Sequence, residues 1–206
     1  RRLEVDTIDL YQIHWPAEGI EEAWETLARA KSAGKLRWIG VSNFDVEQME
    51  RCRAIAQVTS LQPPYSLLDR RFEARELPYC AERGIGTIVY SPMYSGLLSG
   101  AMTRERVQQL PADDWRRRNP QFQDPQLESN LRLVELLRTI GKKHGVLPGQ
   151  VAIAWTLLQP GVTGAIVGAR SASQVDGVFG AGELRLDDDD QAALQRFFGT
   201  STSSTR

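Results

Sequence analysis

Polar or aromatic side chains end five successive β-type runs of this 206-residue sequence. In chain order the ends carry His14, Ser42 with Asn43, Gln62, Tyr90 with Ser91, and the stretch from Gly168 to Arg170. Imidazole, hydroxyl and amide groups donate and accept the hydrogen bonds that orient a polar ligand or polarise a carbonyl. Because each run begins with apolar residues, we interpret the five ends as parts of one chemical site.

The elements that position these groups alternate between strand-like and helix-like patterns. Strands are predicted at residues 8–15, 37–43, 58–62, 86–91 and 164–168. Helices are predicted at residues 20–33, 46–56, 73–83, 127–144, 149–158, 172–179 and 188–198. Helices between consecutive strands predict a parallel sheet, and both a closed barrel and an open doubly wound sheet fit this order.

Two observations favour the barrel over the open sheet. No Gly-x-Gly-x-x-Gly follows any predicted strand, which counts against a Rossmann dinucleotide fold. Barrel enzymes carry their chemistry at the carboxyl ends of the strands, where the polar residues of this sequence lie. We therefore expect an α/β fold of the (β/α)8 or TIM barrel type.

The first strand has two different faces. A period of two places Leu10, Gln12 and His14 on one face, and Tyr11, Ile13 and Trp15 on the other. The second face is expected to pack against helices, so that His14 points into the mouth of the barrel. A lone histidine is more often a core residue bonded to a neighbour, and only the other strand ends reverse that preference.

Several helix boundaries can be read from single residues. Asp45 with Gln48 and Ser171 with Gln174 have the spacing of capping boxes, and Gly34 is a C-terminal cap. The acidic run from Asp187 to Asp190 suits the positive end of a helix dipole, and we interpret it as a helix start rather than a metal site.

Composition excludes several classes of function. The chain has 25 Lys and Arg against 26 Asp and Glu, a net charge of -1 that gives no reason to expect nucleic acid as a partner. The apolar run at residues 151–158 is far shorter than the ~20 residues of a membrane helix, and the N-terminus lacks the pattern of a signal peptide. Cys52 and Cys80 are isolated, which predicts reduced thiols and a cytoplasmic location.

The motifs, taken together, resemble the aldo-keto reductases. They are DLYQIHWP at residues 9–16, IGVSNF at 39–44, Gln62 ahead of YSLL at 65–68, YSPM at 90–93 with GLLSG at 96–100, and GARSASQ at 168–174. Each motif alone is weak, but five in order across residues 1–198 are specific.

The resemblance implies an incomplete barrel. Residues 1–198 match about five C-terminal βα units, strands 4 to 8, and residues 199–206 are expected to form a flexible tail. The family's proton donor is a tyrosine whose pKa is lowered by a lysine and which an aspartate supports, all on earlier strands. We therefore expect the isolated chain to be inactive, with an N-terminal barrel portion or a homo-oligomer covering the open sheet.

The resemblance also implies roles for single residues. His14 matches the histidine that donates a hydrogen bond to a substrate carbonyl, and Tyr90 matches the aromatic ring that stacks on nicotinamide. Ser42, Asn43 and Gln62 match the side chains that bind the carboxamide of that ring. The segment that wraps the pyrophosphate is matched by Ser91, Pro92, Met93, Gly96 and Leu98, and the adenosine site by Gly168, Arg170 and Gln174.

These roles imply an NADPH-dependent oxidoreductase that reduces an aldehyde or ketone by hydride transfer. NADP(H) is favoured over NAD(H) because Arg170 can pair with a 2′-phosphate. The sequence departs from the family at Ala101, where relatives often have a basic residue, and at Gly177 and Val178, where many have Glu and Asn. Arg104 or the cluster Arg116, Arg117 and Arg118 is a candidate substitute, although a solvated basic run explains the cluster equally well.

The sequence also allows other interpretations. A nucleotide-binding regulatory or assembly subunit of the same fold would bind the cofactor without turnover. A metal-dependent hydrolase needs several strand-end ligands, and only His14 is so placed, since His144 closes a helix. A structural fragment without a ligand is the remaining option. The long segment at residues 101–126 is expected to be mobile, and to act as a lid or to mediate assembly.

Overall fold

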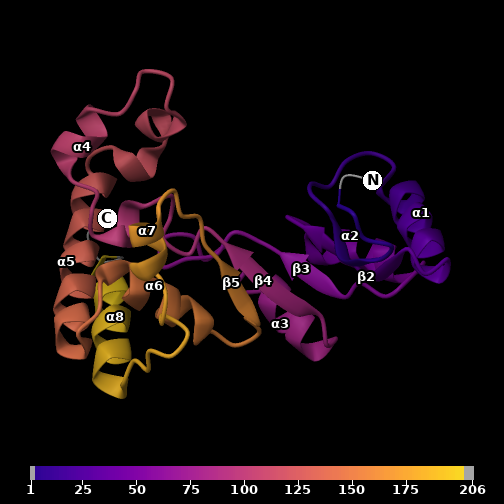
Figure 1. Cartoon of the computed structure of the whole chain (residues 1–206). Coiled ribbons are helices and arrows are strands. Elements are labelled where there is room, and N and C mark those ends of the chain that lie inside the picture. Colours follow the sequence, from indigo (N-terminus) through magenta and orange to yellow (C-terminus); the bar gives the residue numbers. More distant parts are fainter. Residues whose placement is uncertain (1–2, 202–206) are drawn as a thin grey trace. The chain divides into compact units, whose positions relative to one another are not determined.

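The structure is a computed structural model that describes residues 3–201 (Figure 1). Its strands are β1 (Ile8–Ile13), β2 (Leu36–Ser42), β3 (Ser60–Gln62), β4 (Gly86–Tyr90) and β5 (Gly164–Ile166). Its α-helices are α1 (Ile20–Ser32), α2 (Val46–Arg53), α3 (Glu76–Glu82), α4 (Arg104–Gln108), α5 (Gln126–His144), α6 (Pro148–Leu157), α7 (Ala172–Asp176) and α8 (Asp188–Ser201). Three short 3-10 helices are η1 (Leu97–Ser99), η2 (Trp115–Arg118) and η3 (Pro120–Phe122).

The five strands form one parallel sheet in the order β1-β2-β3-β4-β5. Every predicted strand is present, and the α/β class with a parallel sheet is confirmed. Four of the strands are shorter than predicted, while β2 keeps its length and begins one residue earlier. β1 ends at Ile13 and β5 at Ile166, so that Gly168 lies two residues beyond its strand.

The chain divides into two compact units. Unit 1 contains residues 1–65, 69–90 and 159–166, which include the whole sheet and helices α1 to α3. Unit 2 contains residues 66–68, 91–158 and 167–206, which include the remaining helices. The sequence predicted one partial barrel domain over residues 1–198.

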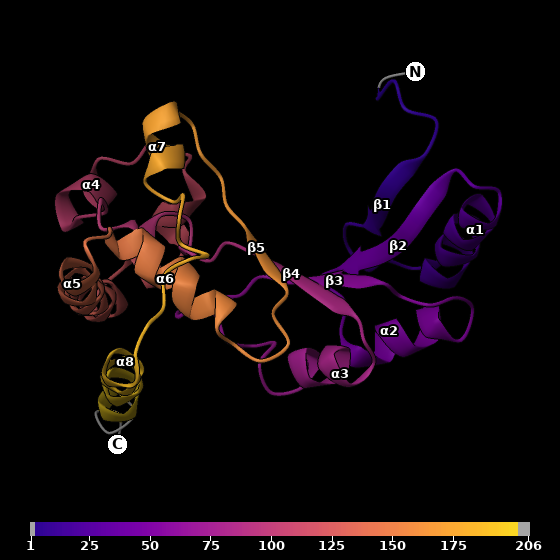
Figure 2. The same cartoon turned by 60° about the horizontal axis from the view of Figure 1, so that its bottom comes forward.

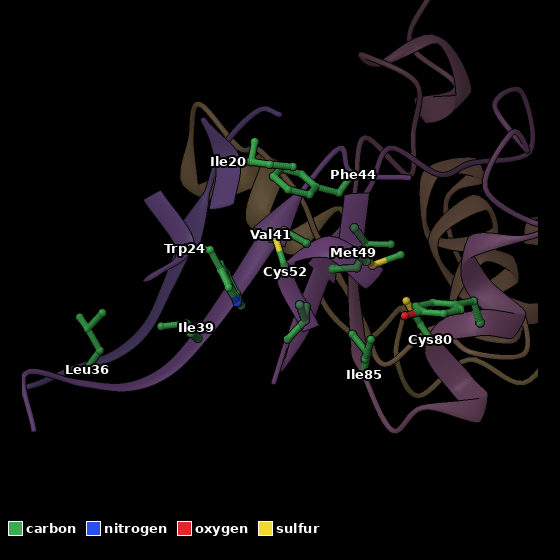
Figure 3. Close-up of a cluster of buried hydrophobic side chains, with 13 residues drawn as sticks. Ile20, Trp24, Leu36, Ile39, Val41, Phe44, Met49, Cys52, Cys80 and Ile85 are labelled. Carbon is green, nitrogen blue, oxygen red and sulfur yellow. The ribbon is translucent and has the colours of Figure 1, made fainter. Parts of the chain in front are cut away.

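The core of unit 1 lies between the sheet and its helices, which cover one face of it (Figure 2). Ile39 and Val41 of β2 point into this layer and pack with Trp24 of α1, and all three are fully buried (Figure 3). The indole Nε1 of Trp24 donates to the carbonyl of Ala56 at 3.1 Å, so burial leaves that polar group satisfied.

Both cysteines belong to the core of unit 1. Cys52 of α2 and Cys80 of α3 are free thiols with no exposed surface (Figure 3). Burial raises the pKa of each thiol to about 11. The prediction of free, reduced thiols agrees with this environment.

The predicted cap at Asp45 is confirmed. Its carboxylate accepts from the Gln48 N–H at 2.8 Å while Gln48 Oε1 accepts from the Asp45 N–H at 3.0 Å, a complete capping box. Gly34 has a φ of 73° after the end of α1, as expected for a C-terminal glycine.

The cap at Ser171 differs from its prediction. Ser171 Oγ accepts from the Gln174 N–H at 3.4 Å, but Gln174 Oε1 accepts from the Arg170 N–H at 2.7 Å instead of from Ser171. The glutamine therefore closes the loop one residue earlier than a capping box would.

The segment at residues 101–126 is folded, which corrects the expectation of a mobile loop. It contains α4, η2 and η3, and its apolar side chains enclose a small core of unit 2. The buried members of that core are Leu97, Met102, Val107, Leu110, Phe122 and Leu127. The sequence did not predict these elements, because 3-10 helices of three or four residues are too short to show a periodic pattern of apolar residues.

Helix α8 begins where the acidic run predicted a helix start. Asp187 Oδ1 accepts from the Asp190 N–H and Asp190 Oδ2 accepts from the Asp187 N–H, at 3.0 and 3.1 Å. The helix continues to Ser201, so residues 199–201 are helical where a flexible tail was expected, and residues 202–206 lie outside the described part of the chain.

A membrane-spanning helix is not found among residues 3–201, since none of their helices is both long and apolar enough.

Candidate functional site

His14 follows β1 directly and is exposed, as a group that must reach a ligand would be. Its ring stacks on that of Trp15, with 5.8 Å between centroids and 24° between planes. Trp15 was expected to pack against helices together with Tyr11 and Ile13. Only Ile13 packs on the core, because β1 is an edge strand of the described sheet and leaves Trp15 58% exposed.

Asn43 connects three of the strand ends in unit 1. Its Nδ2 donates to the His14 carbonyl at 2.9 Å and to Ser42 Oγ at 3.0 Å, and its Oδ1 accepts from the Tyr90 hydroxyl at 2.8 Å. Its backbone has a φ of 64°, in the left-handed region that asparagine tolerates better than most residues. The polar ends of β1, β2 and β4 are therefore bonded to one amide.

Ser42 and Gln62 extend this set of bonds to β3. Ser42 is buried at the end of β2, and its hydroxyl donates to the Gln62 carbonyl at 2.7 Å. Gln62 is half-buried, and its side-chain Nε2 donates to Gln12 Oε1 at 3.1 Å. The structure thus brings together the five site residues predicted in unit 1: His14, Ser42, Asn43, Gln62 and Tyr90.

Tyr90 ends β4 in a half-buried position. Desolvation raises the pKa of its hydroxyl. The positive charge of Arg71 lowers this pKa, and the negative charge of Asp69 raises it further. The hydroxyl is therefore neutral near pH 7 and serves as the donor to Asn43, which fixes one edge of the ring.

The predicted pyrophosphate segment lies in unit 2 and is tightly turned. Ser91, Tyr94 and Ser95 all have a positive φ between 45° and 58°, and Gly96 has a φ of 89°. Leu98 is fully buried and its N–H donates to the Met93 carbonyl at 3.1 Å. Gly100 approaches Pro148 so closely that a Cβ would lie 2.8 Å from the proline ring, which ties the segment to α6.

The predicted adenosine residues also lie in unit 2, where Gly168, Arg170 and Gln174 are all exposed. The side-chain Oε1 of Gln174 accepts from the backbone N–H of Arg170, which fixes the start of α7, while Arg170 itself is exposed.

The arginine cluster is not a simple solvated run. Arg116 forms a two-pronged ion pair with Asp114 and donates to the Ser95 carbonyl at 3.5 Å. Hydrogen bonds from Arg116, with a smaller contribution from the charge of Arg170, lower the pKa of Asp114 to about 2. Arg117 donates to the Leu110 carbonyl at 3.1 Å.

The sequence did not predict that Gln12, Gly40 and Ser60 lie next to the predicted site residues. Gln12 Nε2 donates to Ser60 Oγ at 3.1 Å, across the position of Gly40. The signal was available, because the period of two placed Gln12 on the same face as His14.

This chain is similar to known proteins of one family. The profile described as "Aldo/keto reductase family" matches residues 1–197. Aldo-keto reductase YhdN of Bacillus subtilis is 40% identical, over 98% of this chain and 62% of the relative. Aldo-keto reductase yakc [NADP(+)] of Schizosaccharomyces pombe is 32% identical, over 91% of this chain and 56% of its own length.

A solved structure is similar as well. The glycerol dehydrogenase AKR11B4 of Gluconobacter oxydans has a TM-score of 0.88 and 36% identity, over 97% of this chain and 61% of that one. The chain thus spans about three fifths of the length of these relatives. The family profile, together with the strand-end residues that carry the resemblance, shows that the chain belongs to the aldo/keto reductase family.

Proposed function

We propose that this chain carries the carbonyl-polarising and cofactor-binding residues of an NADP(H)-dependent oxidoreductase that reduces aldehydes or ketones. The observation that carries the proposal is the hydrogen-bonded set at the ends of β1 to β4, with an exposed imidazole beside it. Membership of the aldo/keto reductase family supports the reaction class.

The residues of unit 1 fit a nicotinamide ring. Gln62 uses one N–H on Gln12 and keeps its Oε1 to accept from a carboxamide. Tyr90, fixed by its hydroxyl, offers a half-buried aromatic face on which a flat ring can stack. Reduced nicotinamide, when bound, supplies the hydride.

His14 is proposed to donate a hydrogen bond to the carbonyl oxygen of the substrate. Negative charge develops on that oxygen during hydride transfer, so the bond is stronger in the transition state than in the ground state. Asn43 bonds the His14 carbonyl and thereby positions the backbone from which the imidazole projects. Removal of such a donor lowers the rate by about 10²–10³.

In unit 2, the tight turn from Ser91 to Leu98 is proposed to bind the pyrophosphate, and the start of α7 the adenosine end. Arg170 is proposed to pair with a 2′-phosphate, which favours NADP(H) over NAD(H).

Arg170→Ala should then weaken NADPH binding about tenfold and leave NADH binding unchanged, as isothermal titration can measure. Arg185→Ala, at another exposed arginine of unit 2, is the control. Equal weakening of both cofactors would contradict the role.

No proton donor is proposed among Tyr65, Tyr79 and Tyr90. Desolvation raises the pKa of each, whereas a donor near neutral pH needs a pKa closer to 7. General acid catalysis contributes about 10²–10⁴ to rates, so we expect these 206 residues alone to show little or no turnover.

Binding and turnover can be measured separately. NADPH should quench the tryptophan fluorescence of the chain, and its absorbance at ~340 nm should stay constant when simple aldehydes are added. Gln62→Ala should weaken the quenching, and Gln57→Ala, which removes an exposed amide of the same unit, should not. Rapid NADPH oxidation would overturn the expected inactivity, and absence of binding would overturn the function. A cytoplasmic location and a small carbonyl substrate complete the proposal.

A further inference from the structure

Gln12 lies one pleat below His14 on the same face of β1, next to Gly40 of β2. Gly40 in turn lies next to Ser60 of β3. A Cβ at position 40 would lie 2.1 Å from Ser60 Oγ and 3.2 Å from Gln12 Cγ. The absence of a side chain at Gly40 therefore gives Gln12 the room to reach across β2 to β3.

The contacts of Gln12 decide which way its amide points. Its Nε2 lies 3.1 Å from Ser60 Oγ and 3.5 Å from the Val41 carbonyl. A carbonyl can only accept, so the opposite orientation would set two oxygens against each other. The Gln12 Oε1 is thereby directed at Gln62.

The orientation of Gln12 is passed on to Gln62. Because Gln12 presents an acceptor, Gln62 must turn an N–H toward it, at 3.1 Å. The Oε1 of Gln62 is then directed away from Gln12. An amide fixed in this way offers an acceptor at the strand end, and a reversed amide would offer a donor.

We propose that Gln12 is a positioning residue that fixes the Gln62 amide so that its Oε1 accepts from the N–H2 group of the cofactor's carboxamide. This inference rests on the proposed function and goes beyond it, because it assigns a role to a residue that acts through Gln62. Because Gln12 holds the Gln62 amide in one orientation before the cofactor binds, binding does not carry the entropic cost of ordering that amide.

The test uses two probes that differ only at the carboxamide. NADPH carries the N–H2 group, and the reduced 3-acetylpyridine analogue has a methyl group in its place. The full 206-residue chain should bind NADPH about three- to tenfold more tightly than the analogue, the value of one hydrogen bond. Gln12→Met keeps the length of the side chain and removes its acceptor, and should therefore lower that ratio.

Two further variants separate positioning from folding. Ser60→Ala removes an anchor of Gln12 and should give an intermediate ratio, even if Gln12→Met folds poorly. In Gln62→Met the ratio should already be close to one, and adding Gln12→Met should change it no further. Gln57→Leu is the matched control, with the ratio of the unmodified chain.

The outcomes distinguish the two proposals. If the unmodified chain binds neither probe, the proposed function fails and this inference fails with it. If the chain prefers NADPH and both Gln12→Met and Ser60→Ala, folded as judged by circular dichroism, keep the full preference, the role of Gln12 alone is overturned. Equal binding of the two probes by the unmodified chain overturns the Gln62 contact and with it this inference.

Discussion

A single amide organises the strand ends of unit 1. Asn43 uses both N–H groups and its oxygen on three different partners, and its backbone is left-handed. Aspartate could supply the acceptor but neither donor, and leucine none of the three. At the scale of residues, the site is therefore built around a side chain that can donate and accept at once.

Substitution of Asn43 separates backbone strain from hydrogen bonding. Asn43→Gly should lower the free energy of unfolding by about 2 kcal/mol, because it leaves the partners of the amide partly unsatisfied. Asn43→Ala should cost about 1 kcal/mol more, since alanine is strained at a positive φ. Urea denaturation of the two variants measures both quantities. If alanine proved as stable as glycine, the left-handed backbone at this position would be disproved.

Gly40 is the second residue whose replacement is diagnostic. Gly40→Ala should destabilise the chain by about 1–3 kcal/mol, because its Cβ would overlap Ser60. Gly164→Ala is the control in a strand of the same unit: a Cβ there meets no atom within 4 Å. Thermal unfolding should therefore distinguish the two alanines, and similar midpoints would contradict the close approach of Gln12 and Ser60 across Gly40.

At the scale of elements, the end of α5 is bonded to the start of α8. Lys143 pairs with both Asp187 and Asp190, and His144 Nε2 lies 2.6 Å from Asp190 Oδ2. Asp190 is almost fully buried and also caps its own helix through Asp187. The acidic run that predicts a helix start thus also docks that helix within unit 2.

This junction predicts a pH dependence. The hydrogen bond from Lys143 lowers the pKa of Asp187 from 3.8 to about 2. A depressed folded-state pKa stabilises the protein above the ordinary value, and this stabilisation is lost as the pH falls from about 4 to about 2. Asp187→Asn should therefore lower Tm at pH 7, and the difference from the unmodified chain should shrink over that interval.

Asp189→Asn is the control for this prediction. It removes a charge from the same first turn of α8 and leaves Lys143 and the capping pair in place. Differential scanning calorimetry between pH 7 and pH 2 follows all three proteins. A constant difference between the unmodified chain and Asp187→Asn across the acid range would contradict the assignment of the shift to Asp187.

The segment at residues 101–126 offers a test of a second element. Phe122 is buried and contacts the rings of Tyr94 and Trp115, with centroids 6.3 and 6.2 Å away. Phe122→Ala should cost about 3–5 kcal/mol within this small core and open the segment locally. Trypsin should then cut at Arg116, Arg117 and Arg118 faster, as mass spectrometry can follow.

The half-exposed Trp115 provides the comparison for Phe122. Trp115→Ala removes the exposed partner of the same ring contact and should accelerate cleavage much less. If both variants were cut as slowly as the unmodified chain, the segment would owe its order to something other than the Phe122 core.

At the scale of the whole molecule, the order of elements could be predicted because periodicity and caps are local. Asp45 and Gln48 lie three residues apart, and their bonds need no distant partner. The contacts of Gln12 with Ser60 and Gln62 join residues 48 and 50 positions apart, and no local pattern contains them. The site was thus predictable in its residue types and not in its hydrogen bonds.

The unpredicted folding of residues 101–126 has the same physical origin. Its short helices are stabilised by Phe122 and by the ion pair of Arg116 with Asp114, not by their own periodicity. The division into two units was also not predicted, because it depends on which segments distant in sequence share a core.

The buried thiols allow the opening rate of unit 1 to be measured. Cys52 and Cys80 are its only cysteines, both lie in the core of unit 1, and reagents attack the thiolate, which a pKa of about 11 makes scarce. Labelling by a disulfide reagent should therefore proceed only when unit 1 opens. Tryptic cleavage at the arginines of η2 reports on unit 2 in the same sample. The opening rates of the two units can thus be timed separately in one sample, without first separating the units.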